Sequence, residues 1–324
     1  MTEVAVTSPL PGGALGRLAE RHTVRIRPHG RALAGREVAD FVGQADALIC
    51  LLADKVAAEV FTMCPRLAVV ANYAVGVNNI DLEAARTSGV WVTNTPDVLT
   101  EATADMTWAL ILAVARRVVE GDRLVRAGGF TGWKPDLLLG AGLQGKTLGI
   151  VGMGRIGRAV ARRASGFGMW VCYHSRKEVP ALDGTGGEWV PTLEGLLARS
   201  NVLTLHCPLT PQTRHLMDER RLRMLPRGAL VVNTSRGEIV DEDALARLLA
   251  TGHLAGVGLD VFEREPAVHP ALRGRADAVL LPHLGSATSE ARTAMADLAV
   301  DNVLAVLSGK PPLTPVVRPL VPRT

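Results

Sequence analysis

The stretch Leu148-Gly-Ile-Val-Gly-Met-Gly-Arg-Ile-Gly157 lies in mid-chain in a sequence of 324 residues, and it decides the fold class. A short apolar run, residues 147–151, leads into glycines at 152, 154 and 157, and an amphipathic stretch follows. This strand–turn–helix context distinguishes a dinucleotide-binding G-x-G-x-x-G motif from a chance match. We expect Gly152 to permit the tight turn, Gly154 to let a pyrophosphate approach the backbone, and Gly157 to let the helix pack on the strand.

The composition is that of a globular protein with a large core, since 48% of the residues are hydrophobic and 21% are charged. The net charge of +4 is mildly basic, but Lys and Arg are scattered, which argues against a nucleic-acid-binding patch. No apolar run reaches the roughly 18 residues of a membrane span, and the N-terminus lacks the pattern of a secretion signal. Four isolated cysteines suggest reduced thiols, so we expect a cytoplasmic protein with no metal site and no membrane or nucleic-acid partner.

Strand-like and helix-like segments alternate along the chain, which predicts an α/β architecture with parallel sheets. The expected strands are residues 4–7, 24–27, 47–51, 67–71, 90–92, 147–151, 170–173, 202–205, 229–233, 257–261 and 278–281. The expected helices are residues 14–20, 36–44, 57–63, 82–88, 100–125, 242–250 and 290–307, and the proline-rich tail 311–324 should be extended.

The position of the glycine motif predicts two Rossmann/flavodoxin-like lobes, with the nucleotide-binding lobe inserted into the substrate lobe. Residues 1–99 and 288–324 would form the substrate-binding (catalytic) domain, and residues 100–287 the dinucleotide-binding domain. The last expected helix would return the chain to the first lobe.

The end of the second strand of the nucleotide lobe indicates the cofactor. An NAD site usually has an acidic residue about 20 positions after the first glycine, where it binds the ribose 2′-hydroxyl. Here the chain reads Cys172-Tyr-His-Ser-Arg176, with no carboxylate, and Ser175, Arg176 and Lys177 suit a 2′-phosphate instead. We therefore expect NADP(H), with NAD(H) as the alternative if Arg176 is only a solvated turn residue and Glu178 contacts the ribose. His174 is either a cofactor contact or a plain strand-end residue.

Three ionisable residues follow expected strands of the same lobe: Arg236, Glu265 and His283. Ligands of open α/β sheets bind outside the carboxyl ends of the strands, so these side chains can converge. Together they suit the reduction of a 2-oxo acid. A guanidinium binds the carboxylate, an imidazolium protonates the carbonyl oxygen, and a carboxylate orients the imidazole. Each residue alone is a weak signal, and only their joint placement beside the glycine motif supports this site.

At these positions the chain resembles the D-isomer-specific 2-hydroxyacid dehydrogenases. The resemblance covers residues 4–312 and rests on five motifs in order. They are Val75-Gly-Val-Asn-Asn-Ile-Asp81, Val92-Thr-Asn-Thr-Pro-Asp97, the run from Asn233 to Leu245, the run from Gly258 to Pro266, and Pro282-His-Leu-Gly-Ser-Ala-Thr288. Within the family, Phe130–Gly140 and Phe167–Arg176 are most similar to glyoxylate/hydroxypyruvate reductases.

The resemblance implies a homodimer that reduces a small 2-oxo acid, such as glyoxylate or hydroxypyruvate, to the D-2-hydroxy acid. Arg236 would bind the substrate carboxylate, Glu265 would support His283, and His283 would be the acid/base. The backbone of Val75 and Gly76 would also bind the carboxylate. Leu52 lines the substrate pocket or is simply a buried strand residue. The residues expected to contact the cofactor are Gly152, Gly154, Arg155, Ile156, Gly157, His174, Ser175, Arg176, Cys207, Pro208, Thr103, Thr234, Asp260 and Gly285.

Other members of this fold remain alternatives. The formate dehydrogenases of this fold would have Gln at the position of Glu265, so the glutamate here disfavours formate dehydrogenase activity. A phosphoglycerate or D-lactate type of dehydrogenase and an NAD(H)-sensing corepressor both share the triad. Turnover of a 2-oxo acid distinguishes an enzyme from the corepressor. Trp133 either lines a partner's active site or is a dimer-interface aromatic.

Overall fold

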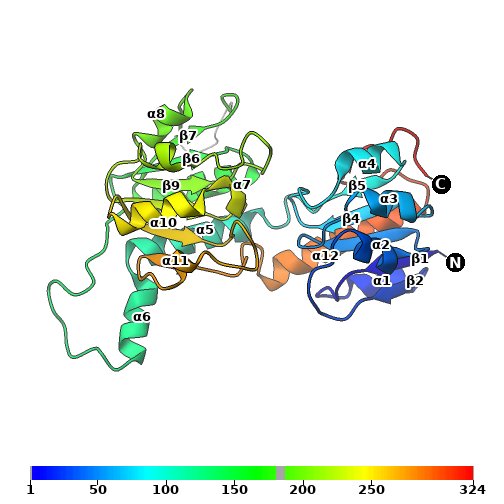
Figure 1. Ribbon diagram of the computed structural model, residues 1–324, viewed down its shortest axis with the longest axis horizontal. Helices are drawn as coiled ribbons and strands as arrows, with labels where there is room; N and C mark the ends of the chain where they lie inside the picture. The colour runs from blue at the N-terminus through cyan, green and yellow to red at the C-terminus, as the bar shows by residue number, and fades with distance from the viewer. Residues whose placement is uncertain (1, 180–186, 324) are drawn as a thin grey trace. The chain divides into compact units, whose positions relative to one another are not determined.

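The computed structural model describes residues 2–179 and 187–323, and the chain divides into two compact units (Figure 1). Unit 1 comprises residues 1–99 and 287–324, and unit 2 comprises residues 100–286. Each unit is a mostly parallel sheet covered by helices, which confirms the expected fold class.

Unit 1 contains a six-stranded sheet in the order β13-β5-β4-β3-β1-β2. All neighbouring strands are parallel except β13, which pairs antiparallel with β5. The strands are β1 Glu3–Val6, β2 Thr23–Ile26, β3 Ala47–Leu51, β4 Val69–Tyr73, β5 Trp91–Thr93 and β13 Pro315–Val317. The helices are α1 Ala14–Ala19, α2 Arg36–Val42, α3 Ala58–Met63, α4 Leu82–Thr87 and α12 Ser289–Leu307.

Both faces of the unit 1 sheet are buried, because successive strand residues alternate between two cores. Leu48, Cys50 and Val70 pack in one cluster with side chains of α2, α3 and α4. The intervening Ile49 and Val69 are also buried, and α12 contacts β3, β4 and β5. The continuous apolar strands thus reflect a sheet covered on both sides.

Unit 2 contains a seven-stranded sheet in the order β12-β11-β10-β9-β6-β7-β8, and all its pairs are parallel. The strands are β6 Thr147–Val151, β7 Trp170–His174, β8 Glu188–Trp189, β9 Val202–Leu205, β10 Ala229–Asn233, β11 Leu254–Leu259 and β12 Ala278–Leu280. The helices are α5 Thr100–Ala115, α6 Val118–Arg126, α7 Arg155–Ala164, α8 Leu193–Leu197, α9 Glu219–Leu222, α10 Glu242–Ala250 and α11 Pro270–Arg273, with short 3-10 helices at Ser165–Phe167 and Gly237–Ile239.

This sheet also separates two cores. Ile150 and Val232 pack with side chains of α5 and α7, whereas Val151 and Val231 pack with side chains of α8, α9 and α10. Because all strands are parallel, their carboxyl ends lie at the same edge of the sheet. The order of the strands therefore fixes the order in which the loops after β12, β11, β10, β9, β6 and β7 follow one another along that edge.

The prediction of a single helix over residues 100–125 is wrong. The chain forms α5 and α6, and Arg117 between them has a left-handed backbone with φ of 54°. The carbonyl of Ala115, which would continue the helix, instead accepts the N–H of Ala141 at 2.7 Å. Gly140 makes this approach possible, because a Cβ there would lie 2.2 Å from the same carbonyl oxygen. A contact with a segment far along the chain thus breaks the helix.

Two short strands were not expected. β8 pairs with β7, and β13 lies in the proline-rich tail, where an extended chain was predicted but no strand. Proline is tolerated in β13 because this strand is at the sheet edge. The four cysteines are free, with Cys207 only partly buried. Among the residues that the structure describes, no helix is long and apolar enough to cross a membrane.

Candidate active site

Most of the expected functional residues of unit 2 lie after parallel strands, at the carboxyl edge of the sheet. Following the strand order, His283 comes after β12, Asp260 after β11, Arg236 after β10, Cys207 after β9 and the glycine loop after β6. A ligand at this edge can meet residues that are far apart in the sequence.

The glycine loop leaves open space in front of α7. Gly152 has φ of 96°, and a Cβ on it would lie 2.7 Å from backbone atoms of His206 and Cys207. A Cβ on Gly157 would lie 2.2 Å from the carbonyl oxygen of Gly152, so the helix and the strand are in close contact. A Cβ on Gly154, in contrast, would meet no atom of residues 2–179 or 187–323 within 4 Å. Two glycines serve packing, and the third faces unfilled space.

The N-terminus of α7 suits an anion. Its N-cap is Gly154, no side chain caps the helix, and the first turn contains no acidic residue. The N–H groups of the first turn and the helix dipole therefore face the space beside Gly154. Arg155 and Ile156 form the start of this helix, and Arg155 is exposed. These features fit the pyrophosphate of a nicotinamide dinucleotide. That cofactor would supply hydride chemistry when bound.

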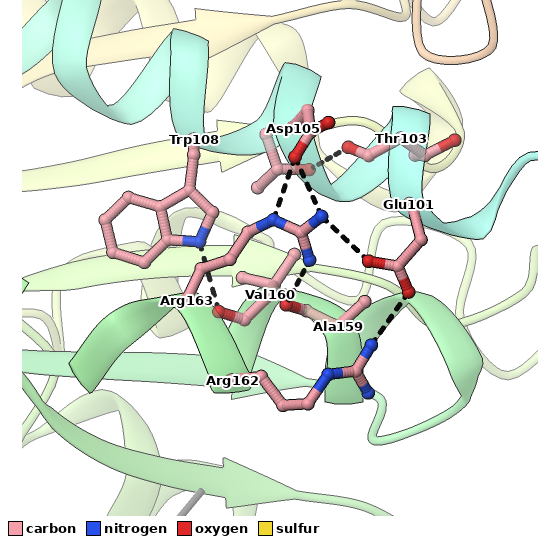
Figure 2. Close-up of polar contacts among 9 residues, drawn as sticks. Glu101, Thr103, Asp105, Trp108, Ala159, Val160, Arg162 and Arg163 are labelled. Carbon is pink, nitrogen blue, oxygen red and sulfur yellow. Dashed lines mark hydrogen bonds and ion pairs between the residues drawn. The ribbon is translucent and has the colours of Figure 1, made fainter. Parts of the chain in front are cut away.

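Ion pairs hold α5 against α7 (Figure 2). Glu101 accepts hydrogen bonds from Arg162 and Arg163 at 2.7 and 2.8 Å, and Asp105 accepts one from Arg163 at 2.8 Å. Trp108 donates its indole N–H to the carbonyl of Val160 at 3.1 Å. The helix that carries Thr103 is thereby fixed relative to the glycine-loop helix.

A buried hydroxyl pair connects α5 to the loop after β10. The hydroxyl of Thr107 is 2.8 Å from the carbonyl of Thr103 and 2.9 Å from the hydroxyl of Thr234. Thr103 also lies near Gly285, since a Cβ on that glycine would be 3.4 Å from the Thr103 methyl group. The structure thus brings together Thr103, Thr234 and Gly285, three of the residues expected at the cofactor.

Asp260 fixes the turn that follows His283. Its carboxylate oxygens accept the N–H groups of Leu284 at 2.6 Å and Gly285 at 2.7 Å, and its own carbonyl accepts the N–H of His283 at 2.9 Å. Burial raises the pKa of Asp260, and the two amide donors oppose that rise. His283 has a left-handed backbone with φ of 56°, which these bonds sustain.

The three expected catalytic residues converge. His283 Nδ1 lies 3.0 Å from Glu265 Oε2, and both side chains are partly exposed. Burial alone would raise the pKa of Glu265, but the bond to His283, the charges of His283 and Arg236, and the amide of Phe262 together lower it. Burial lowers the pKa of Arg236, and the charges of Glu265 and Glu238 oppose that effect. Glu265 thus interacts with both His283 and Arg236.

Close backbone packing sets the loop that carries Arg236. A Cβ on Gly237 would lie 1.9 Å from the carbonyl carbon of Phe262, so this loop touches the one that leads to Glu265. Buried Asn233 donates to the carbonyl of Arg236 at 2.8 Å and accepts the N–H of Ser235 at 3.0 Å. Neither Asn233 nor Gly237 is predicted from the sequence as a supporting residue. Their only signal was their place within the motif that contains Arg236.

The residues at the end of β7 make hydrogen bonds within their own part of the chain. His174 Nδ1 contacts the carbonyl of Val190 at 2.9 Å, and the Ser175 hydroxyl donates to the carbonyl of Lys177 at 2.6 Å. The donor expected to meet a 2′-phosphate is therefore used within the turn. Arg176 is exposed, and within residues 2–179 and 187–323 it makes no ion pair or side-chain hydrogen bond.

His206 and its neighbours contact the glycine loop. The His206 N–H donates to Val151 at 2.7 Å, and its Nε2 is 2.7 Å from the hydroxyl of Thr204. Burial lowers the pKa of His206 to about 3, so this ring is neutral near pH 7. Cys207 is partly buried and Pro208 is exposed.

In unit 1, the expected substrate residues lie on two loops. Val75 and Gly76 follow β4, and in the described part of the chain no hydrogen-bond partner is found for either N–H group. Their carbonyls accept side-chain amides, Val75 from Asn94 at 2.8 Å and Gly76 from Asn72 at 2.8 Å. Leu52 follows β3 and is partly exposed, so it is not a buried strand residue.

Comparisons with known proteins show the family. The model of the D-isomer specific 2-hydroxyacid dehydrogenase NAD-binding domain matches residues 108–285. The chain is 44% identical over 317 residues to a glyoxylate reductase of Thermococcus onnurineus, an alignment that covers 96% of this chain and 95% of that protein.

Two solved structures are similar over nearly their whole length. A protein from Thermus thermophilus is 49% identical with a TM-score of 0.92, covering 98% of this chain and 100% of that one. An NADPH-dependent glyoxylate/hydroxypyruvate reductase of Sinorhizobium meliloti, in complex with NADP and malonate, is 34% identical with a TM-score of 0.89, covering 100% and 99%. The chain therefore belongs to the D-isomer-specific 2-hydroxyacid dehydrogenases, a family of NAD(P)-dependent oxidoreductases.

Proposed function

We propose that this protein reduces a small 2-oxo acid, glyoxylate or hydroxypyruvate, to the D-2-hydroxy acid with NADPH. The observation that carries the proposal is the contact of His283 with Glu265, which interacts in turn with Arg236. The substrates named for the similar reductases of Thermococcus onnurineus and Sinorhizobium meliloti support the choice of acid.

The geometry of the pair supports His283 as the proton donor. Glu265 occupies Nδ1 of His283, so Nε2 is the ring nitrogen left to protonate the carbonyl oxygen of the substrate. Glu265 is negatively charged at neutral pH, because its pKa is lowered, and its contact with Nδ1 of His283 orients the imidazole ring. The guanidinium of Arg236 binds the carboxylate of the substrate and polarises the carbonyl.

His206 is a poor alternative proton donor, because its pKa of about 3 keeps the ring neutral near pH 7, and a neutral imidazole is a very weak acid. The amides of Val75 and Gly76 would receive the carboxylate of the substrate, and Leu52 would contact its carbon chain. The lack of a partner for these N–H groups among the described residues supports this role.

His283→Ala tests the proposal. Removing the general acid should lower kcat for glyoxylate on the order of 10²–10⁴-fold. His253→Ala is the control, because His253 lies at the opposite end of the sheet, before β11. Wild-type turnover in the His283 variant would refute the assignment. An absence of turnover with any 2-oxo acid in the wild-type protein would favour a binding protein of the corepressor kind.

We also propose that NADP(H) is preferred, with its pyrophosphate at Gly152, Gly154 and the start of α7. Arg176, which has no ion-pair partner in the described part of the chain, lies next to Lys177, and this supports recognition of a 2′-phosphate. Arg176→Ala should raise KM for NADPH much more than KM for NADH, as steady-state kinetics with both cofactors would show. Equal effects on the two cofactors would contradict this preference.

The segment around α6 favours a homodimer. Helix α6 has no buried residue, and Figure 1 shows it extending from unit 2 together with the segment that follows. This segment exposes Val125, Phe130 and Leu139, and Trp133 is 82% exposed. Such an apolar surface is typical of an interface. Light scattering should give a dimer that Trp133→Asp weakens, whereas Trp170→Asp, at a tryptophan 71% exposed, should not. Monomeric wild-type protein would refute the dimer.

A further inference from the structure

Two asparagine side chains in unit 1 form a reciprocal amide pair. Asn72 Nδ2 donates to Asn79 Oδ1, and Asn79 Nδ2 donates to Asn72 Oδ1, both at 3.2 Å. Asn72 is fully buried, and its Oδ1 also accepts a bond from the Cys50 thiol at 3.4 Å. A buried polar pair of this kind is stable only when its groups find partners.

The pair reaches both loops that carry expected substrate residues. Asn72 Nδ2 donates to the carbonyl of Gly76 at 2.8 Å, while Asn79 Nδ2 donates to the carbonyls of Leu51 at 3.3 Å and Asp54 at 3.1 Å. The buried carboxylate of Asp54 closes the second loop by accepting the N–H of Leu51 at 2.9 Å. One hydrogen-bonded network thus holds Gly76 and the residues on both sides of Leu52.

These bonds also aim the N–H groups of the loop after β4. In a trans peptide the C=O and the following N–H point in opposite directions. Three successive carbonyls are held: Ala74 by the N–H of Thr95 at 2.9 Å, Val75 by Asn94, and Gly76 by Asn72. The N–H groups of residues 75, 76 and 77 therefore point away from these anchors, and within the described residues none has an internal partner.

We propose that Asn72 and Asn79 are positioning residues for the carboxylate of the 2-oxo acid. They fix the peptide planes whose N–H groups receive the carboxylate, and they hold the Leu51–Asp54 loop at a set position beside them. This inference rests on the proposed function. Neither asparagine touches the substrate, so each acts through the loop that it holds.

Asn72→Asp and Asn79→Asp test the inference with little change of shape. The substitution at 72 removes the donor to Gly76, and the one at 79 removes the donors to the loop that contains Leu52. Asn72→Leu removes the same donor without adding a charge that would repel the substrate. Each substitution leaves a loop carbonyl, that of Gly76 or those of Leu51 and Asp54, without its amide donor, so the loop loses its fixed position. We therefore expect KM for glyoxylate and for hydroxypyruvate to rise together by about ten- to a hundredfold. KM for NADPH and kcat at saturation should stay close to wild type.

Calorimetry with malonate, an unreactive dicarboxylate, measures carboxylate binding at the same loop without turnover. The titration is made in the presence of NADP. Its Kd should rise by the same factor as KM. Val38→Ala is the control for lost stability, since Val38 is fully buried in unit 1 and makes no bond to either loop. It should lower Tm and leave both constants unchanged.

The outcomes separate the two proposals. Asparagine variants that lower Tm without changing KM or malonate affinity would overturn the positioning role and leave the proposed function standing. Wild-type protein that fails to reduce any 2-oxo acid would overturn the proposed function, and malonate binding would still decide the role of the loop. Asn79→Asp keeps the test decisive if the buried Asn72 variants do not fold, because Asn79 is only partly buried.

Discussion

Adding one methyl group at Gly154 distinguishes a ligand-binding role of the glycine loop from a packing role. The backbone of Gly154 has φ of −78° and ψ of −161°, which alanine adopts without strain, and the added Cβ would meet no atom within 4 Å in the part of the chain that the structure describes. Alanine is a poorer N-cap than glycine, which costs about 1 kcal/mol at most, and it restricts the unfolded chain, which returns about 0.4–1 kcal/mol. The free energy of unfolding should therefore change by less than about 1 kcal/mol.

A bound pyrophosphate would meet the methyl group directly. Overfilling a close contact costs about 1–3 kcal/mol, so Kd for NADPH should rise by about five- to 150-fold in Gly154→Ala. Fluorescence titration with NADPH and thermal unfolding measure the two effects separately. Gly152→Ala is the opposite control, because its φ of 96° and its backbone contacts at 2.7 Å predict a large loss of stability. Unchanged NADPH affinity in a stable Gly154→Ala protein would refute a pyrophosphate at this loop.

Three other substitutions test the surroundings of the site. Glu265→Gln removes the carboxylate that orients the ring of His283, so kcat for glyoxylate should fall by about 10²-fold while KM for NADPH stays unchanged; an unchanged kcat would contradict the pairing. His206→Asn tests stability against pH. The pKa of His206 falls to about 3 in the folded state, so the unfolded chain binds the proton first and stability decreases as pH drops from about 6.5 towards 3. Urea unfolding at several pH values should show this slope reduced by up to about 1.4 kcal/mol per pH unit in the variant, whereas parallel slopes would contradict it. Gly237→Ala must separate two loops, since its Cβ would lie 1.9 Å from the backbone of Phe262; kcat should fall about 10²-fold, and an unchanged kcat would show that Arg236 and Glu265 tolerate the shift.

The sequence predicted the features that depend on local pattern. The strands expected at residues 47–51, 147–151, 202–205 and 229–233 match the bounds of β3, β6, β9 and β10, and the helix expected at residues 242–250 matches α10. The break at Arg117 was not predictable, because the pattern is helical on both sides and the cause is Ala141, far along the chain. Nor could β13 be foreseen, since its pairing with β5 joins Val317 to Val92, two residues that are far apart in the sequence.

The candidate site divides in the same way. Arg236, Glu265 and His283 were identifiable because each follows a strand, and parallel strands bring their ends to one edge. The residues that hold them were not. Thr107 bonds to Thr234 across 127 positions, and no periodicity or motif spacing encodes such a pair. Predicting these contacts requires the packed structure.

The order of segments in unit 1 has a consequence for the synthesis of the chain. Residues 100–286 form one continuous stretch, so unit 2 has all its strands once that stretch has left the ribosome. The first 99 residues lack α12, whose Met295 and Val303 are buried in unit 1, until residues 289–307 have also been translated. Residues 1–99 therefore emerge before unit 2 but complete their fold after it, and until then the surface that α12 covers stays exposed, which favours binding by a chaperone.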